Sequence, residues 1–166
     1  MADMFTIRRL TPEDAPVFRS IRLEALQSTP HFFGYSFEEE AAEPLSFFSH
    51  RLDTHVVFGA WHGDALKGIA AMERGRLAKT RHKGTIWGIY LAPDARGHGL
   101  ARKMLTALIN DVRGTVGDLR LTVSTENPGA YRLYHDLGFR EYGREPRALK
   151  IGEIFHDEFL MALRLE

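Results

Sequence analysis

The sequence predicts an α/β (α+β) fold, in which a mixed, mostly antiparallel central sheet of about six to seven strands is flanked by helices. The chain has 166 residues, 44% of them hydrophobic, which suits one domain spanning residues 1–166 with a sizeable core. Along it the apolar pattern changes between the short period of strands and the longer period of helices, in the order βααβββαβαββ. Because strands stand on both sides of two helical crossovers, the sheet must be mixed.

The first half of the chain begins with a strand at residues 5–9, where side chains of opposite polarity alternate. Thr11 as N-cap and Pro12 in the first turn then start a helix that ends near Thr29. A loop containing "EEE" leads into a shorter helix at residues 45–52. The runs "HVVFGAW" and "ALKGIAAM", joined by the turn "HGD", are typical of a β-hairpin.

The second half has the pattern of two strand-to-helix units followed by two strands. The strand "TIWGIYLA" precedes a glycine-rich turn and a helix from Leu100 to near Arg113, whose apolar residues form one stripe. The strand "LRLTVS" precedes a helix in "NPGAYRLYHDLGF", which Gly138 is expected to close. The last two strands are expected at residues 140–142 and within residues 155–164.

The charge balance excludes several classes of partner. Twenty-two basic and 22 acidic residues cancel to a formal net charge of +0, so neither nucleic acid nor an anionic membrane is expected as a partner. No apolar run approaches the ~18 residues of a membrane span, and the start "MADMFTIRRL" lacks the apolar core of a secretory signal. We therefore expect a cytoplasmic protein.

The absence of cysteine excludes disulfides, thiolate metal ligands and an acyl-cysteine intermediate. None of the eight histidines stands in an H-x-x-H or HExxH spacing, and "HDE" at residues 156–158 lies in an expected strand. We therefore expect no metal site.

The stretch "ARGHGLARKML" joins an expected strand to an expected helix through Gly97 and Gly99. Such a junction directs unpaired backbone N–H groups into one concavity, where the helix dipole adds roughly half a positive charge. Arg96 and Arg102 could add guanidinium contacts, and glycine lets the main chain approach an anion closely. The pattern indicates a phosphate site, although two glycines can also simply make a tight turn.

Three phosphate-binding turns compete for this stretch. A dinucleotide-binding turn needs a third glycine where Arg102 stands, and a P-loop needs Gly-Lys-Ser/Thr, which is absent. The remaining form, Arg-x-x-Gly-x-Gly/Ala, is met by Arg96, Gly99 and Ala101.

That third form resembles the coenzyme A turn of the GNAT superfamily of N-acetyltransferases. A later stretch, "NPGAYRLYHDLGF", is similar to the family's second pattern through Asn127, Ala130, Tyr134, Gly138 and Phe139. The resemblance implies the GNAT fold and acetyl-CoA as cosubstrate, and it is weakest over residues 29–55, which shape the acceptor site.

The resemblance also implies roles for single residues. The backbone N–H groups of the turn would hold the pyrophosphate, and the main chain of Ile89 and Leu91 would face the pantetheine arm, with Asn127 on the other side and Tyr134 as general acid for the departing thiolate. The full set of implied cofactor-binding residues is Ile89, Leu91, Arg96, Gly97, His98, Gly99, Leu100, Ala101, Arg102, Asn127 and Ala130.

The chemistry of acetyl transfer agrees with these roles. A thioester needs a neutral amine as attacker, N–H support for the oxyanion, and help for a thiol whose ordinary pKa is about 8.5. Tyrosine is a donor that stays protonated at neutral pH, with an ordinary pKa near 10. Without a cysteine to carry the acetyl group, direct attack in a ternary complex is expected.

The general base is not evident, because the strand before the turn reads Ile86-Trp87-Gly88, without a titratable side chain. The acidic residues between the first two helices are candidates to deprotonate or attract the acceptor, although an acid run is also typical of a solvated surface. These residues are Glu38, Glu39 and Glu40.

The function expected is transfer of acetyl from acetyl-CoA to a primary amine of a small molecule, peptide or protein, with a homodimer possible. A non-catalytic acetyl-CoA-binding or sensing domain on the same fold is the alternative. Tyr134 favours catalysis.

Overall fold

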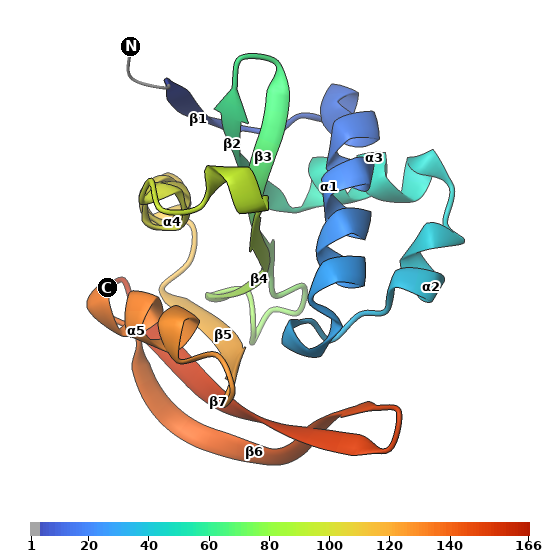
Figure 1. Ribbon diagram of the computed structural model, residues 1–166. Coiled ribbons are helices and arrows are strands. Elements are labelled where there is room, and N and C mark those ends of the chain that lie inside the picture. The colour runs from blue at the N-terminus through green and yellow to red at the C-terminus, as the bar shows by residue number, and fades with distance from the viewer. Residues whose placement is uncertain (1–3) are drawn as a thin grey trace.

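The computed structural model describes residues 4–166 and contains one seven-stranded sheet (Figure 1). The strands lie in the order β1-β2-β3-β4-β5-β7-β6, and among them only β4 and β5 are parallel neighbours. The mixed, mostly antiparallel sheet expected from the sequence is therefore confirmed. The strands are β1 (Phe5–Arg9), β2 (Val56–His62), β3 (Ala65–Arg74), β4 (Lys83–Leu91), β5 (Asp118–Ser124), β6 (Arg140–Ile151) and β7 (Ile154–Arg164).

Helices cover both faces of the sheet. They are α1 (Ala15–Ser28), α2 (Phe37–Ala41), α3 (Leu45–Thr54), α4 (Leu100–Val112) and α5 (Pro128–Asp136), and short 3-10 turns at Pro12–Asp14, Pro30–Phe32 and Pro93–Ala95 precede or follow them. In Figure 1, α1, α2 and α3 lie on one side of the central strands and α4 on the other. No helix within residues 4–166 is both long and apolar enough to cross a membrane.

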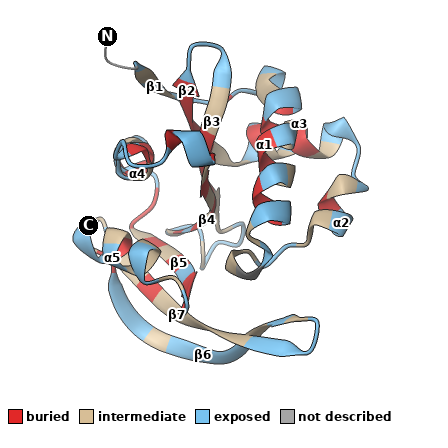
Figure 2. Cartoon of the chain, in the orientation of Figure 1, coloured by how far each residue is buried: buried red, intermediate tan, exposed pale blue. Residues whose placement is uncertain are grey.

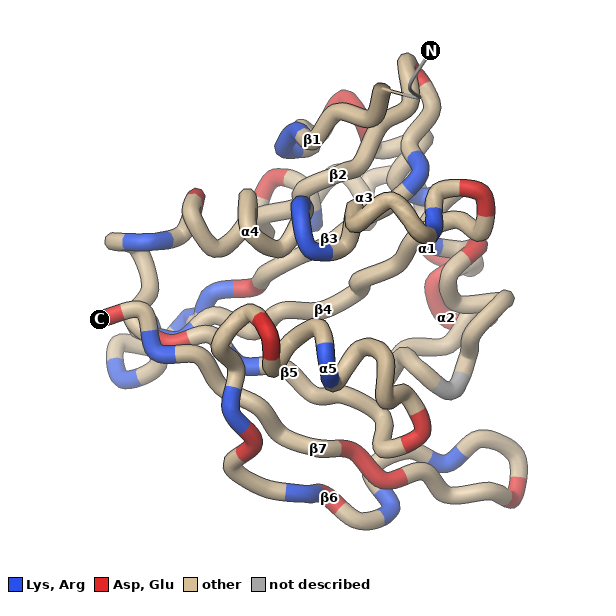
Figure 3. Tube along the Cα trace, turned by 60° about the vertical axis from the view of Figure 1, so that its left-hand side comes forward, with Lys and Arg blue, Asp and Glu red and all other residues tan. Residues whose placement is uncertain are grey.

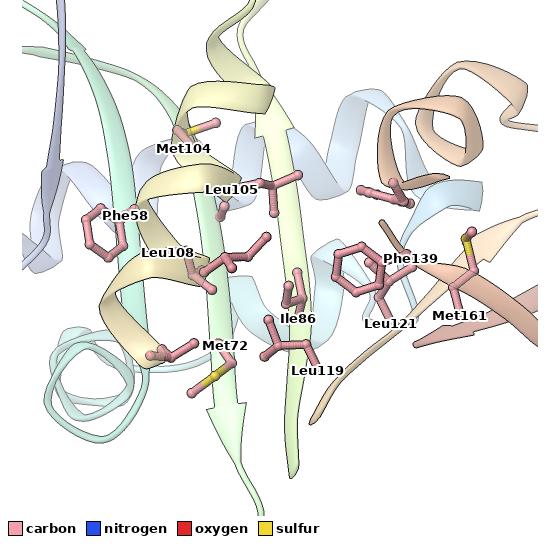
Figure 4. Packing of buried hydrophobic residues seen from close by; sticks show 14 of the residues in the cluster. Phe58, Met72, Ile86, Met104, Leu105, Leu108, Leu119, Leu121, Phe139 and Met161 are labelled. Carbon is pink, nitrogen blue, oxygen red and sulfur yellow. The ribbon is translucent and has the colours of Figure 1, made fainter. Parts of the chain in front are cut away.

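Two hydrophobic cores form because the central strands are apolar on both faces, as sandwiched strands must be. On β3, Ile69 and Ala71 pack with α1 and α3, whereas Ala70 and Met72 pack with α4. Figure 2 shows the buried residues concentrated in these strands and on the inward sides of α1 and α4. Figure 4 shows the second core, where Leu105 and Leu108 of α4 reach the sheet.

The sheet opens between its two parallel strands. Pairing of β4 with β5 covers only Lys83–Thr85 against Asp118–Arg120, after which the strands separate. Gly88 has a φ of +68°, in the left-handed region that glycine adopts without strain, and the register between β3 and β4 shifts beside it. The carboxyl ends of β4 and β5 therefore form the two sides of a gap that leads to the start of α4.

Two segments differ from the expectation. Residues 37–41 form α2 instead of a loop, because Ser36 caps the helix by accepting a hydrogen bond from the backbone N–H of Glu39. Strand β6 continues to Ile151 instead of ending at residue 142, and it forms a long hairpin with β7. Arg147 takes a φ of +55° there, and its N–H donates to Asp157 on the facing strand.

Basic and acidic residues are interspersed along the chain (Figure 3), as the balanced composition predicts. Local pairings of charge decide the electrostatics of the cavity described below.

Candidate active site

A cavity of about 860 Å³ occupies the gap between β4 and β5. One end reaches Gly97 and Ala101 at the start of α4, and the other reaches Arg22 and the aromatic segment after α1. Asn127 and Tyr134 of the α5 region line its side. An extended ligand could therefore pass from one face of the sheet to the other between the separated strands.

The turn at the start of α4 contains two residues in the left-handed region of backbone conformation. Gly97 and Gly99 have φ values of +84° and +70°, and a Cβ added at either position would meet no atom within 4 Å. Glycine is thus required by the conformation, and the surrounding space is open. Leu100 is 1% exposed and anchors the helix in the core, while no side chain caps the helix. The first backbone N–H groups of α4 are consequently left for an anion.

Arg96 links this turn to the end of β4. Its Nε donates a hydrogen bond of 3.1 Å to the carbonyl oxygen of Leu91, and its guanidinium lies 5.8 Å from the centre of the Tyr90 ring. The carbonyl oxygen of Leu91 therefore already accepts a hydrogen bond. Of the two main-chain positions expected to face pantetheine, Leu91 is less available than Ile89. The rest of the exposed Arg96 guanidinium remains beside the turn.

The structure brings most of the predicted cofactor residues to the cavity, but not all. The cavity-lining members are Ile89, Leu91, Arg96, Gly97, Ala101, Asn127 and Ala130. His98 stands at 5.1 Å from the Phe5 ring, and Arg102 pairs with Asp136 at 3.4 Å. Together with Gly99 and the buried Leu100, these two side chains lie outside the cavity wall.

Asn127 caps α5, because its side-chain oxygen accepts a 3.2 Å hydrogen bond from the N–H of Ala130. Pro128 follows at the first helical position, where its fixed φ fits the helix. Asn127 lines the cavity, and its side-chain NH₂, which this cap does not use, is a potential donor.

Tyr134 lies on the side of α5 that faces both the core and the cavity. The residue is 7% exposed and packs edge-on against Phe139, with ring centres 6.2 Å apart. Its hydroxyl makes no hydrogen bond with any residue that the structure describes. Burial raises the pKa of Tyr134 above its ordinary value, so the hydroxyl keeps its proton even in alkaline solution.

Glu40 is buried in an ion-pair network and is not available to a substrate. Its carboxylate accepts two 3.0 Å hydrogen bonds from Arg22 and one of 3.0 Å from Arg51. Glu40 is 2% exposed and Arg22 is 0% exposed. The expectation of a base or a solvated acid at Glu40 is wrong, because α2 turns this side chain toward α1 and α3, where two cations need it.

Glu38 and Glu39 are exposed on α2, and neither lines the cavity. Of the three acids expected at the acceptor site, none lies at its wall. The two carboxylates that do line the cavity are Glu73 on β3 and Glu158 on β7. Glu73 is held by Arg76 at 3.0 Å and by His55 at 3.7 Å.

Aromatic rings surround the Arg22 guanidinium at the acceptor end of the cavity. The Arg22 guanidinium lies 5.1 to 5.5 Å from the ring centres of Trp87, Tyr35 and Phe33. Trp87 donates through Nε1 to Nδ1 of His55 at 3.1 Å, and burial lowers the pKa of His55, which keeps that nitrogen neutral as an acceptor. The aromatic side chains therefore have fixed partners and shape the acceptor end.

The sequence reading missed Arg22 and Glu158. Arg22 stands one turn after Phe18 and one residue after Ile21, on the apolar stripe of α1, so helical spacing alone would have indicated its burial. Glu158 has no comparable signal, because only the pairing of β7 with β5 shows which way it points. No cluster of potential metal ligands occurs within the part of the chain that the structure describes.

A gap between two parallel strands, with a glycine-rich helix start at one end and a buried tyrosine at its side, defines an α/β protein that binds an extended, anionic cosubstrate. The model of the Acetyltransferase (GNAT) family matches residues 20–139, and the chain belongs to this family. It is accordingly an acetyl-CoA-dependent N-acetyltransferase.

Individual relatives agree with this assignment. The N-alpha-acetyltransferase RimI of Mycobacterium tuberculosis is 29% identical over 147 residues, which are 88% of this chain and 85% of that protein. A GNAT-family acetyltransferase from Streptococcus pneumoniae superposes with a TM-score of 0.86 at 23% identity, over 98% of this chain and 100% of the other.

A further solved structure contains the cosubstrate. The acetyltransferase yncA of Salmonella typhimurium, solved with its cofactor acetyl-CoA, has a TM-score of 0.82 at 22% identity, over 98% of this chain and 95% of that one. The Ribosomal-protein-alanine N-acetyltransferase of Brucella melitensis has a TM-score of 0.80 at 24% identity, over 96% and 99% of the two chains. These likenesses establish the fold.

Proposed function

We propose that this enzyme transfers the acetyl group from acetyl-CoA directly to the primary α-amine of a peptide or protein. The observation that carries the proposal is the continuous cavity that joins the glycine turn at Gly97 to Tyr134 and onward to the opposite face of the sheet. Cosubstrate and acceptor can then enter from opposite faces and meet between β4 and β5.

The residues at the turn fit the charged half of acetyl-CoA. The start of α4 offers unpaired N–H groups, and Gly97 and Gly99 leave open space in front of them. Ile89 and Ala130 line the path from the turn toward Tyr134, and Asn127 adds a donor for an amide of the pantetheine arm.

Tyr134 is assigned the role of general acid. The residue lines the cavity, and its hydroxyl has no protein partner within the described residues and keeps its proton because burial raises its pKa. As the bond between carbonyl carbon and sulfur breaks, this hydroxyl can donate its proton or a hydrogen bond to the thiolate.

The acceptor class is proposed from the activities named for two relatives. One is an N-alpha-acetyltransferase and another acts on an alanine of a ribosomal protein, so a peptide or protein N-terminus is the first acceptor to test. An α-amine has a pKa of about 7.7–8.0 and is partly neutral at physiological pH, as the attack requires. A cytoplasmic location belongs to the same proposal.

The test is release of free CoA thiol by the wild-type enzyme with a panel of amines: an alanine-initiated tetrapeptide amide, its N-terminally blocked form, free alanine and spermidine. We expect turnover with the free peptide and none with the blocked one, above the hydrolysis measured without amine. Turnover with spermidine or alanine but not with the peptide would reassign the acceptor to small molecules. No amine-dependent thiol release from any member would contradict the proposed transfer.

A further inference from the structure

We propose that Glu158 of β7 is the general base that removes a proton from the acceptor amine. The inference rests on the proposed function and supplies the base that the strand before the glycine turn lacks. Glu158 lines the same cavity as Tyr134. Its strand, β7, is separated from β4 in the sheet by β5 alone.

The register of the sheet places Glu158 on the acceptor face. Phe159 and Met161, which flank Leu160 on β7, pack into the core shared with α4 and α5. Because side chains alternate along a strand, Glu158 points to the opposite face, the face on which α1 packs against β3 and β4. Tyr134 belongs to the α5 side, so the two polar groups approach the gap from opposite faces, as a base and an acid on either side of a thioester must.

The Glu158 carboxylate is free to act, unlike the other buried or cavity-lining acids. Glu40 is bonded to two arginines and Glu73 to Arg76 and His55. Glu158 has no cationic partner among the residues that the structure describes. Its polar neighbour is the Thr122 hydroxyl of β5, which can orient the carboxylate without neutralising it.

The groups that face Glu158 favour a base at physiological pH. Partial burial has the largest effect and raises the pKa of Glu158. The like charge of Glu145 on β6 raises this pKa further, and a hydrogen bond from the Thr122 hydroxyl lowers it in part. Across the cavity stand Arg22, which shares the Glu40 carboxylate with Arg51, Glu73, which pairs with Arg76, and the protonated Tyr134. A carboxylate with a raised pKa is a stronger base than an unperturbed one.

The proton and electron balance of the step is complete. Glu158 accepts one proton from the acceptor ammonium, and the neutral nitrogen forms a bond to the thioester carbonyl carbon. When the carbon–sulfur bond breaks, the sulfur takes the Tyr134 proton and the nitrogen loses its second proton, which restores the tyrosine through solvent. The net products are an amide, free CoA thiol and one proton that leaves Glu158 for water.

The experiment compares Glu158→Gln, which keeps the shape and removes the base, with Glu153→Gln, a fully solvated acid in the β6–β7 turn whose side chain is 95% exposed. The probe is the alanine-initiated tetrapeptide amide, with spermidine as a second amine. We expect kcat of Glu158→Gln to fall about 100-fold at pH 7, within the usual range for a general base, and the Kd of acetyl-CoA to stay within about twofold. Glu153→Gln is expected to match the parent.

The pH profile separates a base from a packing residue. For the parent, kcat is expected to rise with pH through the pKa of Glu158, and Glu158→Gln should lack this limb. Glu145→Gln removes the neighbouring like charge, so it should shift the limb to lower pH, with the plateau of kcat at or slightly below that of the parent. Glu158→Asp should retain the limb at a reduced rate, because the carboxylate is present but displaced.

The outcomes separate the two proposals. If the parent is active and Glu158→Gln keeps kcat within threefold with the limb intact, Glu158 is not the base. If the parent releases no thiol with any amine, the proposed function fails and this inference with it. Folding is checked by thermal melting at pH 8, where loss of a partly buried, repelled charge should leave Glu158→Gln at least as stable as the parent.

Discussion

Glu40, Glu73 and Glu158 are three acids whose surroundings assign them different tasks. Glu40 is enclosed by Arg22 and Arg51 and serves the fold, whereas Glu73 pairs with Arg76 and lies 3.7 Å from His55. Glu158 faces the cavity without a cation among the described residues. Residue type alone does not distinguish these environments, and the distinction depends on which helix or strand face each residue occupies.

Glu40→Gln is expected to destabilise the protein by about 3–5 kcal/mol, because it leaves two buried guanidinium groups without their shared carboxylate. Glu38→Gln, two residues earlier and exposed on the same helix, is the matched control and should change stability by less than about 0.5 kcal/mol. Denaturant unfolding of the two variants gives the comparison. Equal stabilities would show that the network contributes nothing to the fold.

Tyr134→Phe tests the general acid, because it removes only the hydroxyl group and keeps the ring. The ring keeps its packing against Phe139, so acetyl-CoA affinity should be unchanged. The kcat is expected to fall about tenfold to 100-fold, at or below the low end for a general acid, because a thiolate leaves readily.

The pH dependence refines this prediction. An unperturbed tyrosine would give a fall in rate near pH 10, but burial raises the pKa of Tyr134, so the parent should show no alkaline limb below pH 10. Steady-state profiles of parent and variant measure both effects. A variant within twofold of the parent, with the chemical step rate-limiting, would leave Tyr134 as a packing residue.

At the scale of the element, α4 has a glycine of positive φ at each end. Gly99 precedes the helix with a φ of +70° and Gly114 follows it with a φ of +85°, and a Cβ would meet no atom within 4 Å at either position. The two positions thus share conformation and space, but only Gly99 belongs to the turn beside the cavity. This makes them a matched pair for testing what the turn binds.

Gly99→Asp is expected to abolish measurable acetyl-CoA binding, because it places a carboxylate where the N–H groups of α4 would hold phosphate. Gly114→Asp suffers the same backbone strain, of the order of 1–3 kcal/mol, but should bind acetyl-CoA like the parent. Isothermal titration calorimetry gives both affinities. Similar losses in the two variants would mean that strain, and not the anion site, explains the effect.

The sequence predicted those parts of the molecule that depend on local pattern. The order of strands and helices and the mixed sheet follow from hydrophobic period and turn residues, and Gly138 does close α5, with a φ of +104°. The α2 helix was missed because its five residues contain three adjacent acids, which have no apolar period. The length of β6 was missed because its exposed edge lacks alternation.

The candidate site was predictable where it depends on a contiguous motif and unpredictable where distant segments meet. Arg96, Gly97 and Tyr134 were found from motifs and do line the cavity. The acceptor end joins α1 and the segment after it to β3, β5 and β7, so the sequence order gives no indication of proximity. The sequence places Glu40 at this end on charge alone, whereas in the structure the Glu40 side chain points to the buried Arg22.

At the scale of the whole molecule, the cavity between β4 and β5 and the absence of cysteine predict the kinetic mechanism. Acetyl-CoA and the amine must be present together, because the chain has no thiol to store the acetyl group between half-reactions. Initial rates measured against both substrates are therefore expected to give intersecting lines in double-reciprocal plots. The product CoA should inhibit competitively against acetyl-CoA, since both occupy the turn at Gly97. Parallel lines, or an acetylated protein isolated after incubation with acetyl-CoA alone and required for turnover, would contradict direct transfer and point to a covalent carrier.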